Sequence, residues 1–89
     1  MKLQGEFVVR RIMNDVVAVP VGRTTQAFNG MILLNDVSQV IWESLSQGCT
    51  VDQLSDAVTE RFDVSREEAT ADILEFLDKL RAAQLLEEA

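Results

Sequence analysis

The apolar residues of this 89-residue chain follow two patterns, one in the first third and another in the remainder. In the first third, runs of β-branched and apolar residues are separated by turn-forming residues, which is typical of strands. These runs predict strands at about residues 7–13, 16–21 and 31–34. We expect Asn14-Asp15 to form the first turn, residues 22–26 a loop, and Asn29-Gly30 the turn before the third strand. The pattern therefore predicts a three-stranded antiparallel sheet.

The remainder of the chain has apolar residues at every third or fourth position, which is the spacing of amphipathic helices. The pattern predicts helices at about residues 36–47, 51–62 and 66–83. Capping residues support the last two helices, because Thr50 with Gln53 and Ser65 with Glu68 both fit the capping box. After the last helix, Gln84-Leu85-Leu86 continues as a short strand or an apolar tail.

Three strands followed by three helices indicate an α+β fold. No linker rich in Pro, Gly or Ser separates the two parts, so we expect one domain over residues 1–89. A small sheet with its helices gathered on one side is the natural packing for this order. The same order also describes a winged helix-turn-helix topology.

Charge is unevenly distributed between the two parts. Residues 1–35 carry four basic and two acidic side chains, a net charge of +2, whereas residues 36–89 carry four and thirteen, a net charge of −9. Nucleic-acid binding depends on clustered Lys and Arg that neutralise phosphates. The acidic helices therefore count against a nucleic-acid partner, and a DNA-binding winged helix is kept as an alternative.

The chain has little equipment for chemistry of its own. It contains no histidine and a single cysteine, Cys49, which removes the commonest general base and every internal disulfide or thiolate zinc site. Its four glycines are scattered, so no phosphate-binding loop is present. We expect no enzyme activity, no metal and no cofactor. No apolar run reaches the length of a signal peptide or a membrane span, so we expect a cytoplasmic protein without membrane contact.

Binding of a peptide or protein is the remaining possibility. The predicted strand at 31–34 is a candidate edge strand, and an apolar edge needs a cover, which a partner peptide can provide by adding a strand. On the last helix, Leu74 lies off the main apolar stripe and shares a face with Asp78 and Arg81. Leu74 either contacts a partner or is buried on a second side of the helix. We expect Trp42 in the core rather than as an exposed anchor.

The segment from Asn29 to Glu43, with its strand ending in Leu34-Asn35 and its Ile41-Trp42 pair, resembles the hallmark of the pyrroloquinoline quinone biosynthesis protein D (PqqD) family. Residues 48–54, residues 62–65 and the final Leu85-Leu86 are also similar to the family, so the resemblance covers nearly the whole chain. The chain departs from the pattern at residues 36–38, where the family more often has Glu-Thr-Gly/Ala. This difference suggests a relative of the pyrroloquinoline quinone protein.

The resemblance implies a winged helix-turn-helix-like domain known as a RiPP recognition element, used in natural product biosynthesis. Such a domain binds the leader segment of a ribosomally made precursor peptide and presents it to a modifying enzyme, often a radical S-adenosylmethionine enzyme. The leader is expected to add as a strand beside the third strand and to lie against the third helix. The implied peptide-binding residues are Ile32, Leu33, Leu34, Leu74, Leu77, Asp78 and Arg81. A small homodimerisation module that uses the same edge strand is a third possibility.

Overall fold

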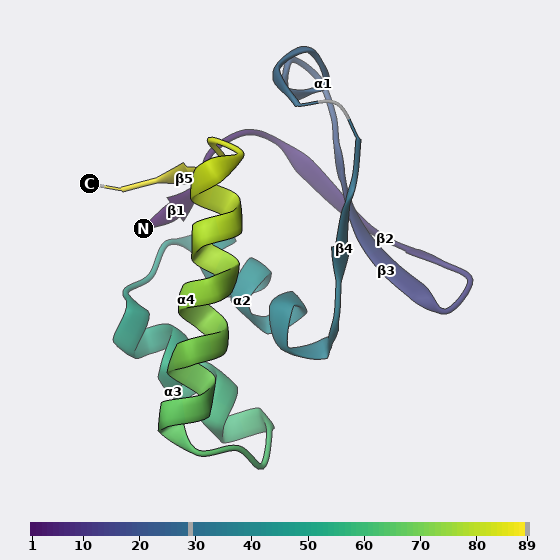
Figure 1. Ribbon diagram of the computed structural model, residues 1–89. Coiled ribbons are helices and arrows are strands. Elements are labelled where there is room, and N and C mark those ends of the chain that lie inside the picture. The colour runs from purple at the N-terminus through teal and green to yellow at the C-terminus, as the bar shows by residue number, and fades with distance from the viewer. Residues whose placement is uncertain (29, 89) are drawn as a thin grey trace. The chain divides into compact units, whose positions relative to one another are not determined.

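The computed structural model describes residues 1–28 and 30–88 of the chain (Figure 1). It divides into two compact units. Residues Gly5–Asp36 form the first, here called the strand unit. Residues 1–4 and 37–89 form the second, here called the helix unit. The first four residues of the helix unit thus precede the strand unit in the sequence and include a strand, β1 (Lys2–Leu3).

The strand unit is a three-stranded antiparallel sheet in the order β2-β3-β4, as the sequence predicts. Its strands are β2 (Phe7–Ile12), β3 (Asp15–Pro20) and β4 (Ile32–Leu34). Each begins and ends within one residue of its predicted range. The central strand β3 is the most buried of the three, and Val16, Val17 and Ala18 within it are all buried.

The turn between β2 and β3 lies one residue earlier than predicted. Ile12 pairs with Asp15, so Met13 and Asn14 form the two-residue connection, and the expected Asn14-Asp15 turn is wrong. Met13 has a φ of +58°, in the left-handed region that Asn normally tolerates better than Met. The pairing of β2 with β3 places Ile12 opposite Asp15, and this register overrides the local preference of the turn residues. The predicted Asn29-Gly30 turn includes Asn29, which lies outside the described residues.

The expected loop at residues 22–26 contains a short helix, α1 (Thr24–Ala27). The Thr24 hydroxyl accepts a hydrogen bond of 2.7 Å from the backbone N–H of Glu6, and the Phe7 and Phe28 rings meet edge to face at 5.9 Å. These contacts hold the connection against the start of β2. A four-residue helix has too few positions to produce a helical periodicity, so the sequence pattern could not identify it.

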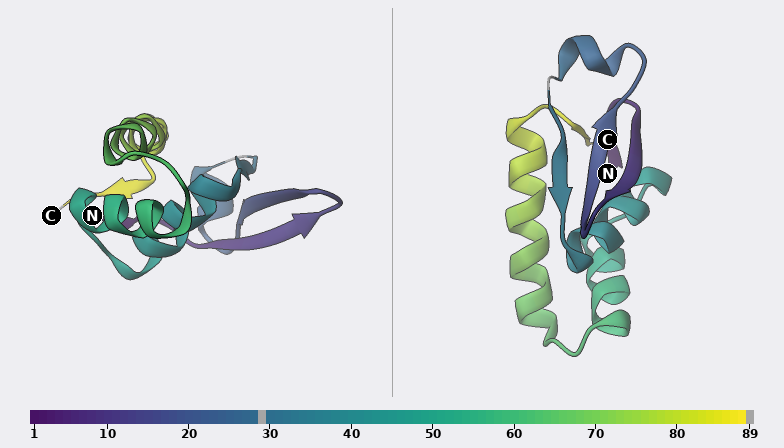
Figure 2. Two further views of the ribbon diagram at one scale, coloured as in Figure 1. Left: turned by 90° about the horizontal axis from the view of Figure 1, so that it is seen from below. Right: turned by 90° about the vertical axis from the view of Figure 1, so that its right-hand side faces the viewer.

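The helix unit contains α2 (Asp36–Gln47), which starts at the boundary between the units, α3 (Val51–Arg61) and α4 (Arg66–Ala82). Figures 1 and 2 show α3 and α4 side by side, joined by a short connection. A hydrogen bond of 3.1 Å between the hydroxyls of the buried Ser55 and of Thr70 links these two helices. The Leu85-Leu86 segment leaves α4 and forms β5 (Leu86–Glu87), which pairs antiparallel with β1. The apolar end of the chain is therefore a short strand.

The helix starts depend on the predicted caps. At α3 the box is complete, because the Thr50 hydroxyl accepts from the Gln53 N–H and the Gln53 side chain accepts from the Thr50 N–H. At α4 the Ser65 hydroxyl accepts a hydrogen bond from the Glu68 N–H. This is one of the two hydrogen bonds of a capping box. Among the residues that the structure describes, no helix combines the length and the apolar character needed to cross a membrane.

Candidate functional site

β4 is an end strand of the sheet. One of its sides pairs with β3, through Val16 with Leu34, Val17 with Leu33 and Ala18 with Ile32. Within residues 1–28 and 30–88, no strand pairs with its other side. The backbone donors and acceptors on that side are available to an added strand. The sequence predicts this edge correctly.

The three residues of β4 are divided between the two faces of the sheet. Leu33 is 65% exposed, whereas Ile32 is half-buried and Leu34 is buried. Successive side chains of a strand point to opposite faces, so Leu33 lies alone on its face within β4. The row of paired residues behind it contains Val17, which is buried, and Arg10, which is exposed. An exposed leucine thus lies directly at the open edge.

α4 presents two distinct faces. Ile73, Leu77 and Leu80 are buried on one of them. Leu74 is 48% exposed, so it is not buried on a second side of the helix and is free to contact a partner. Trp42 of α2 is 3% exposed and belongs to the core, as expected. The family resemblance implies that Leu77 binds the peptide. In the structure Leu77 is only 1% exposed, so almost none of its surface can contact a partner.

Asp78 and Arg81 lie on the exposed part of α4 and form an ion pair of 2.7 Å. The same guanidinium also donates to the Glu88 carboxylate, with Nε at 3.1 Å from Oε2 and Nη2 at 2.7 Å from Oε1. These hydrogen bonds lower the pKa of Glu88 and raise the pKa of Arg81. The side chains of Asp78, Arg81 and Glu88 are all exposed to solvent. They therefore form an ion-pair cluster at the surface rather than a buried charge network.

Glu88 is the residue of this cluster that sequence reasoning missed. It lies seven positions after Arg81, beyond the end of α4, where helical spacing no longer predicts neighbours. The turn at Ala83 and Gln84 and the pairing of β5 with β1 return the chain toward the helix. The apolar Leu85-Leu86 pair is the sequence signal that could have indicated this return, because both leucines are buried.

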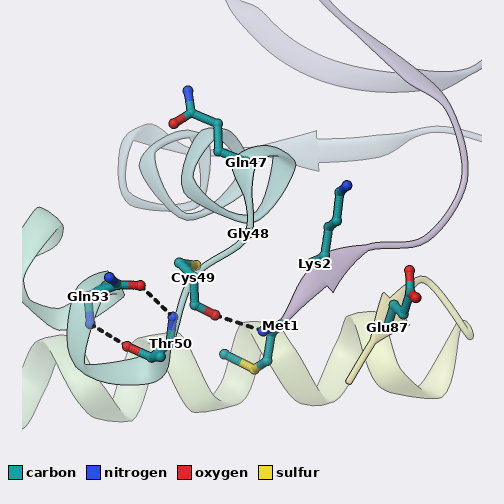
Figure 3. Close-up of a pocket in the computed structure, with 8 residues that line it drawn as sticks. All are labelled: Met1, Lys2, Gln47, Gly48, Cys49, Thr50, Gln53 and Glu87. Atoms are coloured by element: carbon teal, nitrogen blue, oxygen red, sulfur yellow. Dashed lines mark hydrogen bonds between the residues drawn. The ribbon is translucent and has the colours of Figure 1, made fainter. Parts of the chain in front are cut away.

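An open hollow of about 500 Å³ lies within the helix unit, lined by residues of β1, β5 and the connection between α2 and α3 (Figure 3). Met1 and Cys49 exchange two backbone hydrogen bonds there, of 2.8 and 2.9 Å. Partial burial raises the pKa of the Cys49 thiol, which makes its reactive thiolate scarcer. Within the described ranges, no group of three metal-ligating side chains gathers anywhere.

The predicted site residues therefore belong to both units. Ile32, Leu33 and Leu34 lie on the open end strand of the strand unit, and Leu74, Leu77, Asp78 and Arg81 lie on α4 of the helix unit. Four of the seven, Leu33, Leu74, Asp78 and Arg81, combine substantial exposure with a side chain able to contact a partner. Exposed apolar side chains on a small protein are candidates for an interaction surface.

Two comparisons with known proteins bear on these residues. The model of the family described as coenzyme PQQ synthesis protein D (PqqD) matches residues 15–86. The chain is also similar to a solved structure titled "TbiB1 in Complex with the TbiA(beta) Leader Peptide", with a TM-score of 0.75 and 27% sequence identity. That similarity covers 100% of this chain and 98% of the other. No curated protein matches the chain.

Proposed function

The chain belongs to the PqqD family, and we propose that it binds the leader segment of a ribosomally made precursor peptide. The observation that carries this proposal is the similarity, over the whole chain, to TbiB1 in complex with a leader peptide. The adaptor is non-catalytic in our proposal. It holds the precursor so that the segment to be modified reaches a separate enzyme at a high effective concentration.

The peptide adds as a strand to the open edge of β4 in our proposal. Backbone hydrogen bonds along Ile32–Leu34 supply affinity, and side chains on the two faces supply selectivity. The free edge of this strand and the large exposed surface of Leu33 support this mode of binding. The buried Leu34 fixes the position of the strand, because its side chain is anchored on the opposite face from Leu33.

α4 supplies the second group of contacts in our proposal. Leu74 offers an apolar surface, and the Asp78–Arg81 pair offers a fixed charge pattern beside it. Leu77 contributes by holding α4 in its unit, because its side chain is buried. The strand and the helix contacts are separate parts of the proposal, and each can be tested by its own variants.

We further propose that the partner enzyme is of the radical S-adenosylmethionine type. Support for this part comes from the family resemblance of the Asn29–Glu43 segment rather than from any feature of the site. A homodimer would use the same free edge of β4 as the peptide, so the two would compete. Sedimentation with and without peptide distinguishes them, and we expect a monomer that stays monomeric when the peptide binds.

Titration of the ¹⁵N-labelled chain tests the proposal. The probe is a synthetic leader peptide from the precursor encoded beside the gene for this chain, and a scrambled peptide of the same composition is the control. We expect saturable shifts of the amide signals of residues 32–34 and of the exposed side of α4, with no shifts from the control. Absence of saturable binding would contradict the proposal. A gel shift with duplex DNA that weakens with salt would instead favour the DNA-binding alternative.

A further inference from the structure

We propose that the outer edge of β2 is a second interaction surface, which binds an extended acidic segment of the separate modifying enzyme. This inference rests on the proposed function, because an adaptor raises the effective concentration of its peptide only while it also holds the enzyme. The surface is here called the β2 surface, and it lies within the strand unit alone. It comprises Val9, Arg10, Arg11, Ile12 and Met13.

The backbone of β2 has hydrogen-bonding groups on its outer side. β2 is the other end strand of the sheet, and within residues 1–28 and 30–88 no strand pairs with that side. In an antiparallel pair, opposed residues alternate between pairs that are joined by hydrogen bonds and pairs that are not. Glu6 and Val21 are joined by a hydrogen bond of 3.0 Å, and the next pair contains Pro20, which has no N–H to donate. The alternation therefore turns the backbone N–H and C=O groups of Val9 and Arg11 away from β3, toward the open side.

The side chains of the β2 surface are all exposed, and three of them are apolar. Val9 is 45% exposed, Ile12 47% and Met13 90%, and these are three of the six large exposed apolar side chains among the described residues. Successive side chains of a strand alternate between its faces, so Val9 and Arg11 lie on one face and Arg10 and Ile12 on the other. Each face thus offers one apolar side chain and one guanidinium to an added strand.

Charge indicates the kind of partner. The only charged residues at positions 7–14 are Arg10 and Arg11, and within the described part of the strand unit no ion pair joins either of them to an acidic side chain. A carboxylate opposite a guanidinium forms a charge-assisted hydrogen bond, whereas like charges directly opposite each other are unfavourable. A second copy of β2 brings two arginines of its own. A segment that carries Asp or Glu therefore fits this edge better than a second copy does.

The order of the strands keeps the two proposed partners apart. β3 lies between β2 and β4, so the two end strands are roughly 10 Å apart, at about 4.8 Å per strand. A leader peptide on β4 and an enzyme segment on β2 extend the sheet in opposite directions. The adaptor can therefore hold both at once.

Charge reversal tests the β2 surface, with the purified modifying enzyme encoded beside the gene for this chain as the probe. We expect Arg10→Glu and Arg11→Glu each to raise the Kd for the enzyme about 3- to 10-fold and to leave the Kd for the leader peptide unchanged. Arg23→Glu is the matched control, because Arg23 is an exposed arginine of the same unit outside β2, and it should change neither Kd. Thermal melts should match the wild type. A loss of stability that accounts for the lost binding would overturn the surface, because the arginines would then have partners within the chain.

Val9→Pro tests the backbone part, because it removes an N–H that the pairing of β2 with β3 does not use. We expect it to raise the Kd for the enzyme about 10-fold, whereas Val9→Thr, which keeps the N–H, should raise it about 2-fold or less. If Val9→Pro fails to fold, the arginine variants still decide the question. Enzyme binding should persist when the leader peptide saturates the chain, and competition between the two would overturn the surface.

The leader titration separates failure of this inference from failure of the proposed function. A chain that binds the leader, but whose enzyme binding is absent or unchanged in all the β2 variants, would overturn the β2 surface and leave the proposed function intact. A dimer in sedimentation that Val9→Pro converts to a monomer would overturn it in favour of a second copy. A leader that does not bind the wild-type chain would overturn both.

Discussion

Met13 shows at the scale of one residue how the sheet overrides local preference. Its side chain is 90% exposed, so side-chain packing does not offset the cost of its backbone conformation. Its φ of +58° is in the left-handed region, where a side chain with a Cβ is crowded against the following carbonyl. Asn would tolerate this conformation better, but the Asn of this turn is one position later, at residue 14.

We expect Met13→Asn to raise the free energy of unfolding by about 0.5–1 kcal/mol, because Asn relieves part of the cost of positive φ. Denaturant unfolding followed by circular dichroism measures the change. Met13→Leu is the control, since Leu carries the same steric cost at this position. Equal stability of the two variants would mean that the turn is not strained at residue 13.

Arg81 shows how one exposed residue acquires several partners, because its guanidinium holds both Asp78 and Glu88. The ion pair with Glu88 gives a prediction for acid conditions. The folded-state pKa of Glu88 is lowered from 4.5, so its contribution to stability is present above pH 4.5 and is lost as the pH falls through the lowered value.

We therefore expect Glu88→Gln to be slightly less stable than the wild type at pH 7, with the difference disappearing as the pH falls below 4.5. High salt should shrink the difference at pH 7, because the pair is exposed. Thermal melts across pH and salt measure both effects. Glu87→Gln is the control, and its stability should not depend on pH and salt in this way. An equal loss of stability in the two variants would contradict the role of Glu88.

At the scale of the element, α4 shows two adjacent leucines with different roles. Leu77 is 1% exposed and continues the buried stripe of Ile73 and Leu80. Leu74 lies one turn earlier and is 48% exposed. Helical spacing places these leucines only about 60° apart, with Leu74 at the margin of the apolar stripe. It could not decide whether a second buried surface covers Leu74, because that depends on tertiary packing.

We expect Leu77→Ala to lower the free energy of unfolding by about 2–5 kcal/mol, because it leaves a cavity among buried residues. Leu74→Gln should change stability by about 0.5 kcal/mol or less, as a surface substitution, and should weaken leader binding. Denaturant unfolding and peptide titration on the same two variants separate the roles. A Leu74→Gln chain that binds the leader as tightly as the wild type would remove α4 from the proposed site.

The same scale shows what sequence patterns can and cannot supply. The strands follow from runs of β-branched and apolar residues, and the three long helices follow from a period of 3.6 together with caps such as Thr50. The short elements α1 and β1 have four and two residues, too few for any period to be recognised, and for β5 the apolar Leu85-Leu86 pair left a strand and an apolar tail as alternatives. β1 and β5 exist because distant segments pair with each other, and such pairing leaves no mark in either segment alone.

At the scale of the whole molecule, charge follows the division into units. The strand unit carries three basic and three acidic side chains, whereas the helix unit carries five and twelve, a net charge of −7. The open edge of β4 thus lies on the neutral unit, where our proposal assigns recognition mainly to apolar side chains and backbone groups. The sequence predicts the identity of this edge, but the exposure of Leu33 and the burial of Leu34 follow only from the register with β3.

The central claim is that a leader peptide binds by adding a strand to β4, and backbone methylation of the peptide tests it most directly. A series of leader peptides, each N-methylated at one position, is titrated against the wild-type chain. In a strand, alternate amides point toward the neighbouring strand, so we predict that methylation weakens binding at every second position across the bound segment and is tolerated in between. Losses without this alternation, or no losses at all, would contradict strand addition.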